Sequence, residues 1–162
     1  MAARRDRPTV SISSSQQAIR VPRKRIAELA AFVVAAERGR LAEVDVAVVG
    51  TREMARLNRL YRHRGGATDV LSFDLSGAGA TGVSAQIVVC GAVAVREARA
   101  RRLRPQHELL RYVLHGLLHV LGYDDRSDAE AARMHERQEQ LLGDFLRPGR
   151  GGRRGGGGQT DG

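Results

Sequence analysis

One long segment, Gln106 to Leu121, dictates much of the fold because it has the pattern of a helix with an apolar face. At about 100° per residue, five apolar side chains share one stripe. They are Leu110, Val113, Leu114, Leu117 and Leu121. His115, His119 and Glu108 fall on the opposite side. Gly122 follows where a helix is expected to end, since glycine tolerates the left-handed conformation of a C-terminal cap.

The two histidines of this segment are placed to bind one metal ion. His115 and His119 are four residues apart, so they lie on the same face of a helix. Past Gly122 the chain reverses and offers Asp124 and Asp125 as oxygen donors. Two histidines and one carboxylate, with a coordination position left open, are typical of a catalytic zinc site. Histidines at this spacing also occur by chance and could contact phosphate at a surface, but the glycine and the two acids favour a metal site.

Gly116 argues against one familiar use of such a site. Zincin peptidases have the pattern His-Glu-x-x-His, in which the glutamate serves as general base. Gly116 stands at the position of that glutamate and cannot accept a proton. Two histidines at the spacing of metal ligands, in a chain with a basic net charge, favour action on a phosphodiester instead.

Segments of β type and helical type alternate along the rest of the chain. Its 162 residues are enough for one domain with a substantial core. Strands are predicted at residues 9–13, 43–49, 70–75 and 86–90. Helices are predicted from residue 22 to about residue 38, from residue 51 to residue 61, and over residues 92–102, 106–121 and 128–146. The glycine-rich stretch 77–82 fits G-x-G-x-x-G, but no helix follows it, so we interpret it as a loop between strands.

The two ends of the chain differ in composition from the middle. Residues 1–8 are predicted to be a flexible basic leader, and the Gly- and Arg-rich residues 148–162 a disordered tail, which leaves residues 9–147 as the domain. The leader has no apolar stretch of the signal-peptide type, and the longest apolar run, 29–36, is too short to span a membrane. The lone Cys90 can form no internal disulfide. We therefore expect a soluble, cytoplasmic protein that binds no membrane.

The charge of the chain favours a nucleic-acid partner. The formal net charge is +9, and Lys24 is the only lysine, so nearly all the positive charge is arginine. Guanidinium groups match phosphates in a two-pronged geometry and stack on bases. Codon bias would also produce an arginine-rich composition, so the sign of the charge is the better evidence. Aromatic residues make up 4% of the chain, too few for an extended base-stacking platform.

Two separate blocks of sequence resemble the YbeY family of bacterial endoribonucleases. The first is the stretch 115–124, His-Gly-Leu-Leu-His-Val-Leu-Gly-Tyr-Asp. The second lies upstream and comprises Leu-Asn-Arg-Leu-Tyr-Arg at 57–62 and Thr-Asp-Val-Leu-Ser-Phe at 68–73. Two blocks in the same order and at a similar distance make the resemblance specific, and it covers roughly residues 44–145.

The resemblance implies a fold, a site and a function. The fold is an α+β domain with a small mixed four-stranded sheet, about five helices and a metal site at the end of a central helix. The implied site binds one zinc ion through His115, His119 and the residue at position 125, and the implied catalytic-cleft arginine is Arg59. The implied function is cleavage of single-stranded RNA, with maturation of the 3′ end of 16S rRNA and ribosome quality control as the cellular tasks. The expected partners are rRNA precursors and the ribosome or its proteins, and no DNA.

The chain departs from the family pattern at two positions. The usual third ligand is histidine, whereas this chain has Asp125. Aspartate is a competent zinc ligand and would widen tolerance for harder divalent metals such as manganese. Asp124 is adjacent and could compete for the ion. The family's Gly-Asp-Ile before the last strand appears here as Ala85-Gln86-Ile87, which removes an acid from that strand.

Two hypotheses follow from these patterns. The first is a zinc-dependent endoribonuclease specific for single-stranded RNA and acting on rRNA precursors. The alternative is a non-catalytic, metal-stabilised ribosome-assembly factor whose basic surface binds RNA or a ribosomal protein. The Asp125 and Gln86 departures give the alternative its weight.

Overall fold

The computed structural model describes residues 7–61, 70–77 and 82–148. Most of the predicted leader, all but the first residue of the predicted tail, and most of the glycine-rich loop therefore lie outside the described residues. In the described part, four strands and five helices form the single α+β domain predicted from the sequence. The order and type of these elements agree with the prediction throughout.

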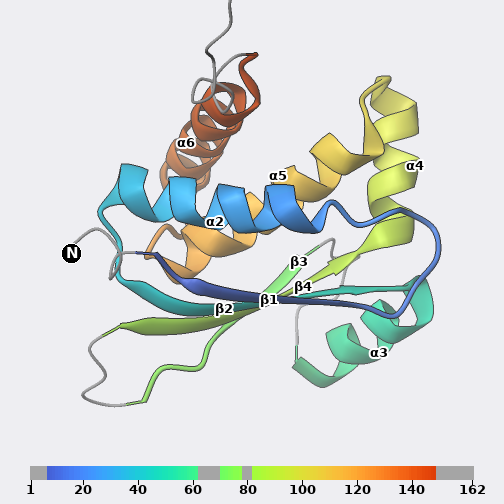
Figure 1. Ribbon diagram of the computed structural model, residues 1–162, viewed down its shortest axis with the longest axis horizontal. Helices are drawn as coiled ribbons and strands as arrows, with labels where there is room; N and C mark the ends of the chain where they lie inside the picture. The colour runs from blue at the N-terminus through green and yellow to red at the C-terminus, as the bar shows by residue number, and fades with distance from the viewer. Residues whose placement is uncertain (1–6, 62–69, 78–81, 149–162) are drawn as a thin grey trace, which may run out of the picture.

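The four strands form one mixed sheet in the order β1-β2-β4-β3. The first three in that order run parallel, and β3 runs antiparallel to β4 at one edge (Figure 1). Their bounds are β1 Thr9–Ser14, β2 Leu41–Val49, β3 Val70–Asp74 and β4 Val83–Cys90. The largest difference from the prediction is in β4, which begins at Val83 rather than Gln86, because Val83 and Ser84 pair with the first residues of β2.

Five helices surround the sheet. Their bounds are α2 Arg23–Glu37, α3 Thr51–Tyr61, α4 Gly91–Arg101, α5 Pro105–Val120 and α6 Asp128–Leu146. Helices α2, α5 and α6 lie on one side of the sheet, and α3 lies on the other (Figure 1). None of the helices in the described part of the chain is long and apolar enough to cross a membrane.

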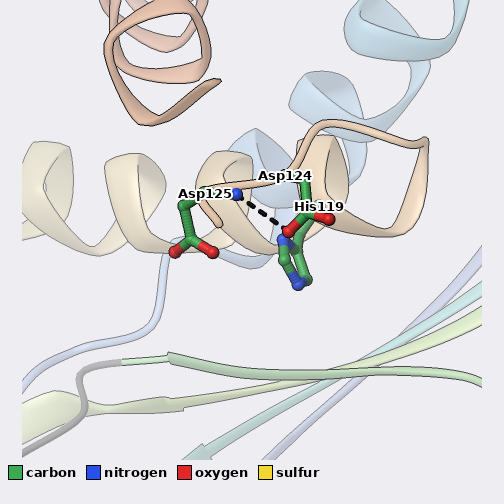
Figure 2. Close-up of side chains that lie close together, drawn as sticks. All are labelled: His119, Asp124 and Asp125. Atoms are coloured by element: carbon green, nitrogen blue, oxygen red, sulfur yellow. Dashed lines mark hydrogen bonds between the residues drawn. The ribbon is translucent and has the colours of Figure 1, made fainter. Parts of the chain in front are cut away.

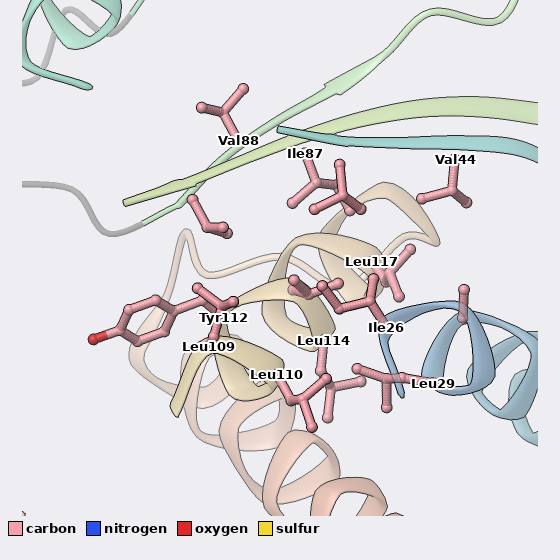
Figure 3. Packing of buried hydrophobic residues seen from close by; sticks show 14 of the residues in the cluster. Ile26, Leu29, Val44, Ile87, Val88, Leu109, Leu110, Tyr112, Leu114 and Leu117 are labelled. Carbon is pink, nitrogen blue, oxygen red and sulfur yellow. The ribbon is translucent and has the colours of Figure 1, made fainter. Parts of the chain in front are cut away.

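Alternation along the central strands decides which side chains meet the helices. Val44, Val46 and Val48 alternate along β2, and each is almost completely buried. In β4, Ile87 points toward α5 and Val88 points away from it (Figure 3). Because successive strand residues face opposite sides of a sheet, Gln86 shares the face of Val88. Cys90, the last residue of β4, is buried and unpaired as predicted.

Helix α5 is the centre of the core. It contacts β3, β4, α2, α4 and α6. Its leucines and Val113 are at most 1% exposed, and several of them fill the space between the sheet and the neighbouring helices (Figure 3). The prediction of a polar side on α5 is therefore only partly correct. His115 is half-buried and His119 exposed, but Glu108 is 1% exposed, because helices cover this side of α5 as well.

Candidate metal centre

A glycine turn ends α5 and brings the following loop back toward the helix. Gly122 has a φ of +118°, in the positive region that the sequence predicted. Its N–H donates to the carbonyl of His119 at 3.1 Å, and the N–H of Tyr123 donates to the carbonyl of Leu118 at 3.0 Å. These two bonds form a Schellman motif, which satisfies carbonyls left free at the helix end. The motif fixes the direction in which residues 124 and 125 leave the helix.

His119, Asp124 and Asp125 come together beside this turn (Figure 2). Each offers one ligand atom, and these atoms all lie within 4.8 Å of one another. The N–H of Asp125 donates to Oδ1 of Asp124 at 2.8 Å, which holds the two acids in a fixed relation. One imidazole nitrogen and carboxylate oxygens converging in so small a space are a donor set that suits zinc or a harder divalent cation.

The predicted ligands fall into two groups. His119 and Asp125 belong to the cluster, and Asp124, named from the sequence as a competitor, joins them. His115 is not part of that group. It lies one turn earlier on α5, and its Nδ1 is 2.8 Å from Oε1 of Gln138 on α6. That contact leaves Nε2 of His115 available to bind a metal ion. Because His115 lies outside the cluster, its role as a ligand stays a prediction.

Hydrogen bonds from other elements anchor the loop that carries the two acids. The hydroxyl of Tyr123 donates to Oε1 of Glu37 at 2.9 Å, and Nε of Arg137 donates to the other oxygen of Glu37 at 2.6 Å. Burial and the bond to Glu37 raise the pKa of Tyr123, so its hydroxyl remains a donor at neutral pH. Beyond Tyr123, Nε of Arg126 pairs with Asp124 at 2.9 Å. The loop is thus tied to α2 and α6 immediately before the cluster.

The structure gives a steric reason for Gly116. A Cβ atom at this position would lie 2.9 Å from Cγ2 of Ile87 on β4, closer than side-chain atoms can approach. Helix α5 crosses the sheet so closely here that any side chain at position 116 would force Ile87 to shift. A glutamate, the base of zincin peptidases, has no room at this position.

Two other predicted residues lie away from the cluster. Arg59 is exposed in the last turn of α3, a helix that packs against β4 and α4. Among the contacts of the described residues, none joins Arg59 to the cluster, so its part in catalysis stays a prediction. Gln86 points away from α5 and donates to Asp45 on β2 at 3.3 Å. Gln86 therefore belongs to the sheet face opposite α5, and its effect on the site stays a prediction.

The sequence interpretation missed Gln138, the residue that contacts His115. Gln138 is 6% exposed and belongs to the packing face of α6. The signal was present in the sequence, because Gln138 lies four residues after Met134 and three before Leu141, within the apolar stripe. A polar residue in such a stripe needs hydrogen-bond partners, and His115 and Glu139 provide them.

Comparisons with known proteins identify the family of this chain. The family model described as "Endoribonuclease YbeY" matches residues 11–146. Endoribonuclease YbeY of Anaeromyxobacter sp. strain Fw109-5 is 39% identical over 148 residues, covering 87% of this chain and 77% of that protein. The protein of the same name from Anaeromyxobacter dehalogenans is 41% identical over 140 residues, covering 81% of this chain and 71% of that protein.

A solved structure has the same fold. The solution structure of TM1509 from Thermotoga maritima matches with a TM-score of 0.57 and 28% identity, covering 85% of this chain and 89% of that one. The family match spans every strand and helix described above except the first two residues of β1. With the fold, the glycine turn and the adjacent donor cluster in place, the chain is a member of the YbeY family.

Proposed function

We propose that this protein is a metal-dependent endoribonuclease. The observation that carries the proposal is the cluster of His119, Asp124 and Asp125 at the end of α5, in a chain that belongs to a family of endoribonucleases. The formal net charge of +9 supports a polyanionic substrate, because arginine-rich surfaces attract phosphates from a distance.

The proposed metal is a single zinc ion held by His115, His119 and Asp125. When bound, such an ion withdraws electron density from a phosphodiester and makes a water molecule more acidic. The chain's own residues set the conditions for this chemistry. The Schellman motif at Gly122 places the acids, and the contact between His115 and Gln138 leaves one ring nitrogen free. A carboxylate in place of the family's third histidine favours tolerance of manganese as well as zinc.

The proposed substrate is single-stranded RNA. Arg59 would hold the scissile phosphate and stabilise the negative charge that builds up during cleavage. Its position in the last turn of an exposed helix suits contact with a long flexible substrate. In the cell we propose maturation of the 3′ end of 16S rRNA and ribosome quality control, in the cytoplasm and in contact with the ribosome or its proteins.

The first test combines elemental analysis with an RNA cleavage assay on the same purified samples. The wild type is compared with Asp125→Ala and Asp124→Ala, and with Asp144→Ala as a control that removes an aspartate outside the cluster. Loss of both zinc and cleavage in Asp125→Ala, with Asp144→Ala unchanged, supports the proposed ligand set. The same losses in Asp124→Ala alone would assign the third ligand to Asp124.

A second pair of variants separates catalysis from RNA binding alone. Arg59→Ala is expected to keep zinc and lose most cleavage, while Arg52→Ala removes the same charge from the same exposed helix and is expected to cleave normally. If the wild type holds no metal and leaves single-stranded RNA intact, the nuclease proposal fails. The non-catalytic assembly factor then becomes the better description.

A further inference from the structure

A chain of partly buried hydrogen bonds runs between α5 and α6 to the ring of His115. It begins at Glu108, whose side chain is 2% exposed. Arg111, one turn later on α5, donates from a terminal nitrogen to Oε1 of Glu108 at 2.5 Å. A buried carboxylate needs such a partner, because an uncompensated charge in the core is strongly destabilising. Glu108 therefore fixes the position of the Arg111 guanidinium.

Arg111 in turn binds Glu139 on α6 with two parallel hydrogen bonds. Its Nε donates to Oε2 at 2.9 Å, and its other terminal nitrogen donates to Oε1 at 3.1 Å. Burial opposes ionisation of Glu139, but the bonds from Arg111 and Gln138 outweigh it and lower the pKa of this carboxyl. Glu139 is thus ionised at neutral pH and can only accept hydrogen bonds.

The ionised Glu139 decides which way the amide of Gln138 points. Nε2 of Gln138 donates to Oε2 of Glu139 at 3.0 Å. With its nitrogen turned to the carboxylate, the amide presents its oxygen to His115, and Oε1 lies 2.8 Å from Nδ1. An amide oxygen has no proton to give, so the proton in this contact belongs to Nδ1 of His115.

We propose that Gln138 is a positioning residue that holds His115 in the tautomer protonated at Nδ1 and presents its Nε2 lone pair to the metal. The proposal rests on the proposed function in that it takes His115 as a ligand. In water a neutral histidine prefers to carry its proton on Nε2, the atom that coordination here requires to be free. A fixed acceptor for Nδ1 favours the tautomer that carries its proton there, which leaves Nε2 free for the metal ion. The same hydrogen bond also holds the plane of the ring.

Packing alone does not account for an amide at this position. Gln138 lies among Met134, Leu141, Leu142 and Phe145 on the buried face of α6. An apolar side chain would fill the same space without the cost of burying a polar group. The amide is satisfied on both of its ends, one by Glu139 and the other by His115.

The test uses three variants on α6. Gln138→Met keeps the length of the side chain and its burial but removes the amide oxygen. Gln138→Glu keeps an oxygen acceptor for Nδ1. Gln140→Met is the matched control, because Gln140 is the same residue type, exposed on the same helix and bonded to Arg137.

The first measurement is the tautomer of His115 in metal-free protein, from long-range ¹H–¹⁵N spectra of the imidazole nitrogens. The proton is expected on Nδ1 in the wild type, Gln138→Glu and Gln140→Met, and mostly on Nε2 in Gln138→Met. A wild-type spectrum with the proton on Nε2 overturns the proposal by itself, whether or not any variant folds. Gln138→Met with the proton still on Nδ1 overturns it as well.

The second measurement is zinc affinity, from competition with a coloured chelator. Gln138→Met should bind zinc about 10- to 100-fold more weakly, while the other two variants stay within a few-fold of the wild type. Unchanged affinity in Gln138→Met overturns the positioning role. If the wild type binds no zinc, the proposed metal centre fails and the positioning role fails with it, whereas the tautomer spectra still report whether Gln138 sets the proton of His115.

Discussion

Replacing Gly116 by alanine tests the close approach of α5 to the sheet. The added carbon would lie 2.9, 3.2 and 3.3 Å from three side-chain atoms of Ile87, compared with about 3.5–4.0 Å for an optimal carbon contact. Forcing an extra methyl into a packed core costs about 1–3 kcal/mol. Replacing glycine by alanine within a helix stabilises the helix by about 1 kcal/mol. We expect a net loss of about 1 kcal/mol in the free energy of unfolding.

Gly143 in α6 provides the matched control. Apart from the adjacent backbone of its own helix, no atom of the described residues would lie within 4 Å of a Cβ at this position, and the residue is helical. Gly143→Ala should therefore show the helix-propensity gain alone, about 0.5–1 kcal/mol, which raises the melting temperature by roughly 2–4 °C per kcal/mol. The same substitution should thus lower the free energy of unfolding in one helix and raise it in another. Urea and thermal unfolding followed by circular dichroism measure both effects.

A double-mutant cycle identifies the contact responsible. Ile87→Ala removes the three atoms that would lie nearest to the new carbon. In that background Gly116→Ala should stabilise the protein, as Gly143→Ala does in the wild type. A steric clash between position 116 and Ile87 is refuted if Gly116→Ala stabilises the wild type as much as Gly143→Ala does. It is also refuted if the loss of stability is the same with and without the Ile87 side chain.

Three further predictions concern polar contacts. Burial opposes ionisation of Glu139, but the bonds and positive charge of Arg111 outweigh it and lower the pKa of that carboxyl. Its stabilising effect is therefore complete above the ordinary glutamate pKa and is lost as the pH falls through the lower folded value. Glu139→Gln should flatten the decline in unfolding free energy between about pH 5 and pH 3, and an equally steep decline in both proteins would contradict this. Tyr123→Phe removes the hydroxyl that donates to Glu37 and should lower the free energy of urea unfolding by about 0.5–1.5 kcal/mol; a neutral effect would mean that this bond does not anchor the loop. Ser127→Ala breaks the capping box at the start of α6 and should cost about 1 kcal/mol by the same assay, whereas Ser127→Asp, which keeps a capping oxygen, should cost much less.

The local patterns of the chain were sufficient to predict its elements. Alternation predicted β2, helical spacing predicted α5 and α6, and Gly122 predicted the turn after α5 with its positive φ. These features depend on interactions between residues close together in the sequence, so the sequence pattern is enough to predict them. For the same reason the sequence identified His119 and Asp125, which are six residues apart on either side of that turn, as neighbours.

What the sequence left open depends on contacts between distant segments. Helical periodicity puts Glu108 on a polar side of α5 because it assumes one buried face. It does not reveal that helices cover the other side too, where Glu108 is buried. The partner of His115 lies 23 residues later on α6, and only the packing of the two helices brings it there. The distance from Arg59 to the cluster is a tertiary quantity of the same kind, and no pattern within α3 encodes it.

The burial of α5 divides the candidate metal centre into two halves that contribute differently to the core. His115 belongs to the interior of a helix enclosed by the sheet and three other helices, so its backbone amide should exchange with solvent only when the whole domain unfolds. The acids belong to a short loop after that helix, where residue 125 is exposed and contributes nothing to the core. A substitution in the loop can therefore alter the preference for one cation over another at little expense in folding stability.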